Sequence, residues 1–328
     1  MTLAPWHADN WQRLLARRAQ DRLPHALLLC GAAGLGQRDF AERLAAMILC
    51  EKDDAPCGTC QACHLYAQRF QRDPEETRPD GTLAQPQGHP GHPDARFVGH
   101  ALNEKSSPKK MYTELTVDQI RDLSAWLVLP PQLGRAQVAL IDPADELNVA
   151  ASNALLKTLE EPGERRHLIL VSSRPARLSA TIRSRCQRIE FHLPPREQAQ
   201  AWLAGQGISA KVAGAALDAA SGNPGLALEL TNAGGLELRA EVDADMQALR
   251  AGNASPAQIA NRWSKSDPER CLWFAARHLQ DRARALTAPT ELPKLSAGFD
   301  RINRAREQLR GPLRTELVIL DALAALAA

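Results

Sequence analysis

A glycine-rich octapeptide between two apolar stretches limits what this chain can fold into. Residues 31–38 read GAAGLGQR, which matches the phosphate-binding pattern G-x-x-x-x-G-K-[ST] at its two glycines, Gly31 and Gly36. The apolar run Ala26–Cys30 before the loop predicts a buried strand, and Asp39–Leu49 after it predicts a helix. A strand, loop and helix in this order are typical of an α/β domain of the nucleotide-binding kind.

Two positions of the loop lack the side chains that its chemistry requires. Gln37 stands where the pattern has a lysine that contacts the β- and γ-phosphates, and Arg38 stands where a hydroxyl holds Mg²⁺. A neutral amide carries no charge, and a guanidinium has no acceptor with which to bind a cation. We therefore expect the architecture of an ATPase without its activity, and no ATP bound by this chain.

Length and composition are those of an ordinary globular protein with two or three domains. The chain has 328 residues, of which 44% are hydrophobic and 24% charged, and its net charge is +2. No apolar run reaches the roughly 18 residues that would indicate a membrane span. Residues 1–15 lack the pattern of a secretory signal. We expect a cytoplasmic protein that has no membrane partner.

Short apolar segments alternate with amphipathic ones up to residue 193, which predicts a parallel sheet with helices. One helix is expected over Val117–Leu129. Another is indicated by apolar residues four apart from Leu147 to Leu159, and Pro162 ends it. The expected strands are Ala26–Cys30, Arg96–His100, Gln137–Asp142, His167–Ser172 and Arg188–Phe191.

Pro-Pro at 194–195 and Gly-Gly at 234–235 divide the rest of the chain. Beyond residue 235 the pattern is helical and rich in alanine. Residues 71–93 are rich in Pro, Gly, Asp and Glu, so we interpret them as a mobile surface insertion and assign them no role. The predicted domains are an α/β domain (1–193), a small helical domain (194–234) and an all-α domain (235–328).

Four of the seven cysteines lie close together and predict a metal site: Cys50, Cys57, Cys60 and Cys63. Four thiolates with two C-x₂-C steps suit a closed tetrahedral shell around structural Zn²⁺. An iron–sulfur cluster is an alternative, but its run needs a cysteine at position 67, where Ala67 stands. A segment without metal is the third possibility. We favour zinc, and we expect His64 to be a surface imidazole. The isolated cysteines are expected to be buried: Cys30, Cys186 and Cys271.

The acidic segment after the third expected strand also departs from an active site. Asp142 matches the Walker B acid that helps to hold Mg²⁺, but Pro143 follows it and cannot act as a base. Asp145 and Glu146 come later, and we interpret them as caps of the next helix. The expected loss of activity thus rests on three positions.

Arginines gather in residues 165–188, which contain no acid. A solvated face normally mixes both signs of charge, so an anionic partner is the favoured interpretation. Arg185 ends a short segment just before an expected strand. From such a turn an arginine can reach a phosphate that is bound on a neighbouring subunit. The seven arginines are Arg165, Arg166, Arg174, Arg177, Arg183, Arg185 and Arg188.

Several motifs together resemble the clamp-loader branch of the AAA+ ATPases. The most specific are the block NALLKTLEEP at 153–162 and the triplet SRC at 184–186. The resemblance covers about residues 1–230 by motif, and beyond that it rests on helical character. The other segments are Pro5-Trp6, LPHALL at 23–28, the four-cysteine insertion, HPD at 92–94 and GRAQV at 134–138.

The resemblance implies an AAA+ domain with a helical lid and an all-α collar, in a pentameric ring with gamma/tau motor subunits and a delta subunit. Such a ring loads a sliding clamp onto primed DNA in replication, as part of the DNA polymerase III holoenzyme. It implies that Arg185, in a turn shaped by Ser184 and Cys186, serves in trans as an arginine finger. The four cysteines correspond to the family's zinc module. The chain itself is expected not to hydrolyse ATP.

Two alternatives remain open. An active gamma/tau-type ATPase subunit shares the cysteines and the SRC triplet, but Gln37, Arg38 and Pro143 argue against it. A zinc-dependent nucleic-acid-binding protein is favoured by the arginines, whereas a net charge of +2 and only two tyrosines argue against it.

Overall fold

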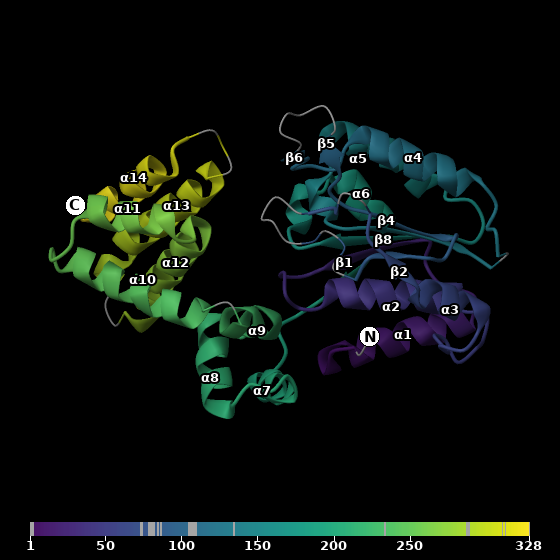
Figure 1. The fold of residues 1–328 in the computed structure, drawn as a ribbon, viewed down its shortest axis with the longest axis horizontal. Helices are drawn as coiled ribbons and strands as arrows, with labels where there is room; N and C mark the ends of the chain where they lie inside the picture. The colour runs from purple at the N-terminus through teal and green to yellow at the C-terminus, as the bar shows by residue number, and fades with distance from the viewer. Residues whose placement is uncertain are drawn as a thin grey trace. The chain divides into compact units, whose positions relative to one another are not determined.

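A computed structural model of the chain, drawn in Figure 1, describes residues 3–72, 75–77, 83, 85, 87–103, 110–133, 135–232, 234–286, 289–309, 311 and 313–327. Contacts within the chain define two units. The first consists of residues 1–209 and 222–226, and the second of residues 210–221 and 227–328. The division into three domains stays a prediction.

The first unit is built on a five-stranded parallel sheet with the strand order β4-β7-β8-β1-β9. In this register Leu28 is opposite Leu170 on one side and Arg188 on the other. All five residues of β1 are buried, because a strand covered by helices on both faces has to be apolar on both. The strands are β1 (Ala26–Cys30), β4 (Ala95–Val98), β7 (Gln137–Ile141), β8 (Arg166–Ser172) and β9 (Gln187–Glu190).

Helices cover both faces of this sheet (Figure 1). Leu27 and Leu29 belong to one core, whereas Leu28 and Cys30 belong to the other, as the alternation along a strand requires. On the first face lie α1 (Ala8–Ala19), α2 (Gln37–Leu49) and α3 (Gln61–Ala67). On the second lie α4 (Val117–Val128), α5 (Val149–Glu160) and α6 (Ala180–Arg185). The loops after the parallel strands meet at one edge, where ligands of such folds bind.

Short elements complete the first unit. They are η1 (Pro5–His7), η2 (Ala144–Glu146), η3 (Pro175–Arg177), α7 (Arg196–Gly205) and the antiparallel pairs β2 (Arg69–Phe70) with β3 (His89–Pro90) and β5 (Leu102–Asn103) with β6 (Lys110–Met111). α4 begins at a capping box, in which the Gln119 side chain accepts from the backbone N–H of Thr116 over 2.9 Å. The residues after α4 include Pro130, which cannot continue a helix.

In the described residues of the second unit, all of the regular secondary structure is helical. Trp263, Phe274, Ile302 and Leu323 are among its buried side chains. The all-α character expected for the C-terminal region is therefore confirmed. Its helices are α8 (Ala210–Ala219), the greater part of α9 (Pro224–Asn232), α10 (Gly235–Arg250), α11 (Pro256–Lys265), α12 (Pro268–Ala285), η4 (Pro289–Glu291), α13 (Leu292–Gln308) and α14 (Thr315–Ala327).

The expected strands of the sheet are all present, with ends displaced by two residues at most. α2 begins at Gln37, two residues earlier than expected, because Gly36 serves as its N-cap. Cys30, Cys186 and Cys271 are buried, as predicted. Among the described residues, we find no helix with the length and apolar character needed to cross a membrane.

Candidate functional site

The turn between β1 and α2 keeps the tight geometry of the glycine motif. Gly36 has a φ of 86°, a left-handed conformation that glycine adopts without strain. Gly34 has the same φ. A Cβ added to Gly31 would lie 2.6 Å from the carbonyl oxygen of Phe191. The sequence is therefore restricted to glycine here by backbone shape and by close packing.

Side chains of the chain itself close this loop. Gln37 Nε2 donates to the carbonyl oxygen of Ala32 over 2.8 Å, and Asn223 Nδ2 donates to that of Ala33 over 2.7 Å. A Cβ on Gly225 would overlap the carbonyl oxygen of Gly34. The amide at the lysine position thus binds the loop's own backbone, and residues 222–226 pack directly on the loop.

The N-terminal turn holds the loop from another direction. Trp6 Nε1 and His7 Nε2 both donate to the carbonyl oxygen of Leu35, over 3.1 and 2.7 Å. The His7 ring is buried, with its centroid 4.7 Å from that of Phe191 and 5.6 Å from that of Phe40. Burial lowers the pKa of His7 from 6.5 to about 4, while its hydrogen bond to the Leu35 carbonyl opposes this shift.

Arg38 lies in a polar network at the carboxyl end of β7. Its Nε contacts Glu42 Oε1 at 2.7 Å and its Nη1 contacts Asp142 Oδ2 at 3.1 Å. Its Nη2 donates to the side-chain oxygen of Gln85, and its guanidinium lies 4.9 Å from the centre of the Phe97 ring. Arg38, which stands where the motif has a hydroxyl, therefore contacts Asp142, the residue that matches the Walker B acid.

This network is largely shielded from solvent. Side-chain exposure is 16% for Arg38, 1% for Glu42 and 8% for Asp142. Burial alone would lower the pKa of Arg38, but the two carboxylates outweigh it and hold that pKa above its ordinary value. Glu42 also contacts Arg69 Nη2 at 3.2 Å. Asp142 is thus paired with a cationic side chain of the same chain.

The two acids after Pro143 form ion pairs with side chains of the same chain. Arg174 contacts Asp145 at 3.0 Å and Glu146 at 2.7 Å, and His100 Nε2 lies 2.8 Å from the other oxygen of Glu146. The expectation that these acids cap α5 was wrong. The cap is Asn148, whose side chain accepts from the backbone N–H of residue 151 over 2.8 Å. Both acids lie in η2, which precedes that cap.

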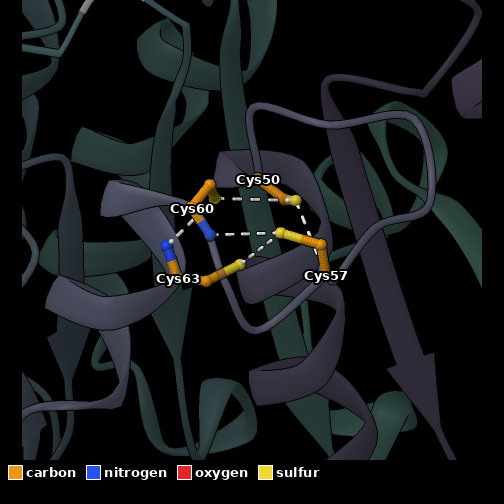
Figure 2. A group of neighbouring side chains, drawn as sticks. All are labelled: Cys50, Cys57, Cys60 and Cys63. Carbon is orange, nitrogen blue, oxygen red and sulfur yellow. Dashed lines mark hydrogen bonds between the residues drawn. The ribbon is translucent and has the colours of Figure 1, made fainter.

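The four predicted cysteines come together beside α3 (Figure 2). Their sulfurs all lie within 4.8 Å of one another, and the pairs Cys50–Cys60 and Cys57–Cys63 are 3.9 Å apart. Backbone N–H groups donate to three of the sulfurs over 3.3–3.4 Å. Hydrogen bonds from Thr59 to the Cys57 sulfur, above all, lower the pKa of Cys57 to about 6.

This cluster fits a tetrahedral metal ion. Zn–S bonds of about 2.3 Å place the four sulfurs of a tetrahedral site about 3.8 Å apart, close to the 3.9 Å of the two pairs Cys50–Cys60 and Cys57–Cys63. Among the described residues, no other group of His, Cys, Asp or Glu side chains is placed to hold a metal ion. His64 does not belong to the cluster. His64 is exposed, as expected.

The Ser184-Arg185-Cys186 triplet ends α6 and leads into β9. Ser179 caps the helix by accepting from the N–H of Ile182 over 3.2 Å, and Ile182 and Cys186 are buried in the second core. Ser184 Oγ donates to the carbonyl oxygen of residue 181 over 3.0 Å. The Arg185 side chain is 33% exposed and contacts Glu160. The helix is therefore fixed, while its last arginine faces solvent in part.

Other arginines of the 165–188 cluster have structural contacts. Arg166 donates to the carbonyl oxygens of residues 127 and 129, and Arg183 to that of residue 175. Arg188 contacts Glu190 at 2.7 Å. Part of the excess positive charge that indicated an anionic partner thus holds loops and strands of the chain in place.

Part of the 71–93 insertion is buried, unlike the surface position that we expected. Glu76, Gln85 and His89 are 8%, 1% and 4% exposed. Glu76 contacts His89 Nε2 at 2.9 Å and Arg72 at 2.6 Å. Residues 73–74, 78–82, 84 and 86 of the insertion lie outside the described residues. Sequence reasoning missed the contact between Gln85 and Arg38, since nothing in the pattern links the two positions.

A family model and several relatives point to the same family. Residues 6–195 match the family model described as "DNA polymerase III, delta subunit". The chain is 35% identical over 265 residues to DNA polymerase III subunit delta′ of Pseudomonas aeruginosa, and 34% identical over 230 residues to that of Escherichia coli. These alignments cover 79% and 69% of this chain, and 71% and 60% of those relatives.

More distant similarities are also present. DNA polymerase III subunit tau of Bacillus subtilis is 31% identical over 174 residues, which are 52% of this chain and 25% of that protein. A solved structure of a gamma subunit-related protein from Thermotoga maritima covers 96% of this chain and 97% of its own, with a TM-score of 0.43 and 16% identity.

The parallel sheet, its glycine loop and the helical second unit define the AAA+ class of α/β proteins, as expected. Within that class, the chain belongs to the DNA polymerase III delta-prime family.

Proposed function

We propose that this chain is a clamp-loader subunit that does not hydrolyse ATP and that supplies Arg185 to the ATP site of a neighbouring motor subunit. In the complex it would act beside gamma/tau motor subunits and a delta subunit in a pentameric ring. That ring would load the sliding clamp onto primed DNA during replication. Membership of the delta-prime family supports the subunit assignment.

The Arg38–Asp142 contact is the observation that carries the inactive part of this proposal. Active sites of this class need a lysine for the phosphates and Mg²⁺ between the loop hydroxyl and the Walker B acid. Here the cation at Asp142 is a partly buried guanidinium, and Gln37 binds the loop backbone. Pro143 offers no base. The active gamma/tau-type alternative would need all of these contacts to be replaced.

The position of Arg185 supports the second part. It ends a helix anchored by buried Ile182 and Cys186, so its side chain extends from a fixed backbone. An arginine finger has to be held in this way, because its contribution depends on placing the charge at the phosphate that reacts. Ser184 and Cys186 would shape the turn and have no contact with the nucleotide.

Structural zinc in the cysteine cluster is part of the same proposal. Cys50, Cys57, Cys60 and Cys63 would hold it as thiolates. A closed four-sulfur shell leaves no position for substrate, so the ion would contribute folding free energy and no catalytic step.

Reconstitution with the motor subunits tests the role of Arg185. We expect Arg185→Ala to lower ATP turnover at the adjacent motor site by at least about tenfold, since arginine fingers contribute about 10³–10⁵ in rate. Exposed Arg177 provides the matched control, and Arg177→Ala should leave turnover unchanged. Equal turnover for Arg185→Ala and the unchanged protein would remove the finger assignment.

A further inference from the structure

Glu160 and Arg185 form an ion pair between the last residues of two helices. Arg185 Nη2 lies 2.6 Å from Glu160 Oε1. Glu160 ends α5 and Arg185 ends α6, and both helices belong to the first unit. The two side chains are 49% and 33% exposed, so each can be reached from outside the subunit.

The rest of the Arg185 environment lets the side chain move while its backbone stays fixed. Besides Glu160, its guanidinium donates from Nη1 to the carbonyl oxygen of Thr181, 3.1 Å away and one turn earlier in the same helix. The side chain is therefore folded back on its own subunit. Rotation about its side-chain bonds would release both contacts without disturbing the buried residues of α6.

The ion pair also neutralises the positive charge of Arg185, to which a phosphate would bind. A guanidinium binds carboxylate and phosphate through the same donors, so the two anions compete for it. Arg183 donates to the carbonyl of Pro175, and Arg188 pairs with Glu190, so these neighbours have contacts of their own. Glu160 is thus the carboxylate with which a phosphate would compete.

We propose that Glu160 is a positioning residue that holds Arg185 against its own subunit until a nucleotide phosphate on the adjacent motor subunit displaces it. The inference rests on the proposed role of Arg185. Glu160 thus restrains Arg185 and lowers the rate of ATP hydrolysis at low nucleotide concentration.

Glu160→Gln in the reconstituted complex tests this restraint, because the substitution removes the charge and keeps the shape. We expect kcat/KM for ATP to rise about two- to fivefold at low salt, the range expected of a half-exposed ion pair. The increase should shrink as salt is raised, because salt screens exposed charges. Glu160→Asp, which keeps the charge, should return the value toward that of the unchanged protein. Glu161→Gln is the matched control at the next, exposed position and should have no effect.

The double variant Glu160→Gln/Arg185→Ala separates the two proposals. It should have the same kcat/KM as Arg185→Ala alone, since Glu160 acts only through the arginine. A value for Glu160→Gln equal to or below that of the unchanged protein would overturn the restraint, and so would an effect that persists without Arg185. If Arg185→Ala itself changes nothing, the proposed finger fails instead.

Discussion

The guanidinium of Arg38 and the carboxylate of Asp142 lie 3.1 Å apart, although 104 residues separate them in the chain. The contact joins the first turn of α2 to the end of β7, the two elements between which an active enzyme of this class holds Mg²⁺. A metal ion bound in this place would have to compete with Arg38 for the same carboxylate.

Removing one member of this pair is expected to destabilise the first unit. Arg38→Met should lower the free energy of unfolding by about 3 kcal/mol or more, since it leaves buried Asp142 without this cation. In Arg38→Met/Asp142→Asn the loss should be smaller than the sum of the two single losses by about 0.5–3 kcal/mol. Urea unfolding of the four proteins measures this coupling, and strict additivity would show that the contact contributes nothing.

Nucleotide binding is expected to be absent from the isolated chain. Calorimetric titration with Mg-ATP should give a dissociation constant weaker than about 1 mM, because the loop lacks its lysine and a side chain occupies the metal position. An active gamma/tau-type subunit under the same conditions is the positive control. Gln37→Lys/Arg38→Thr should bind at least about tenfold more tightly than the unchanged chain. Micromolar affinity in the unchanged chain would contradict the inactive assignment.

The cysteine cluster is expected to hold one zinc ion per chain, purified under reducing conditions. Cys60→Ser should lose the ion and lower the unfolding temperature by about 5 °C or more, since structural zinc stabilises the folded state. The control Cys271→Ala changes a buried cysteine of the second unit. This variant should keep the zinc ion of the cysteine cluster. Mass spectrometry of metal content checks both variants. A chain without zinc, or with iron in its place, would refute the assignment.

Stability is expected to fall in mild acid because of His7. Its pKa is about 4 in the folded chain and 6.5 when solvated, so between these values only the unfolded chain binds the proton. The free energy of unfolding should therefore rise with pH from about 4 to 6.5. His7→Gln should flatten this slope, whereas His192→Gln at an exposed position should not. Denaturant unfolding across this range measures the difference, and identical slopes would exclude His7 as the cause.

The sequence was sufficient for the features that depend on local pattern. Apolar runs of strand length located the sheet, and two C-x₂-C steps located the cysteine cluster, because both are encoded within a few neighbouring residues. The N-cap of α5 is also encoded locally, by Asn148. We predicted Asp145 and Glu146 as the caps instead, because acids are a more conspicuous capping signal.

Contacts between distant segments could not be read in this way. The Arg38–Asp142 pair, the Gln85 contact and the hydrogen bond from Asn223 to the glycine loop depend on how the tertiary fold places loops side by side. The Arg38–Asp142 pair alone has a partial signal in the sequence. An arginine at the start of α2 and an acid at the end of a strand both fall at the carboxyl edge of a parallel sheet, where the loops after neighbouring strands lie close together.

A side chain on Gly225 would overlap Gly34 of the glycine loop. The glycines of this motif are therefore constrained by packing, whereas other positions of the motif reflect its chemistry. Substitutions at Gly31 and Gly34 should be poorly tolerated whether or not a nucleotide ever binds, because Phe191 crowds the first and residues 223–226 crowd the second. Gln37 and Arg38 are the positions that report on chemistry. A search that scores glycine spacing alone would count this chain among the hydrolases, whereas one that scores the two residues after Gly36 would not.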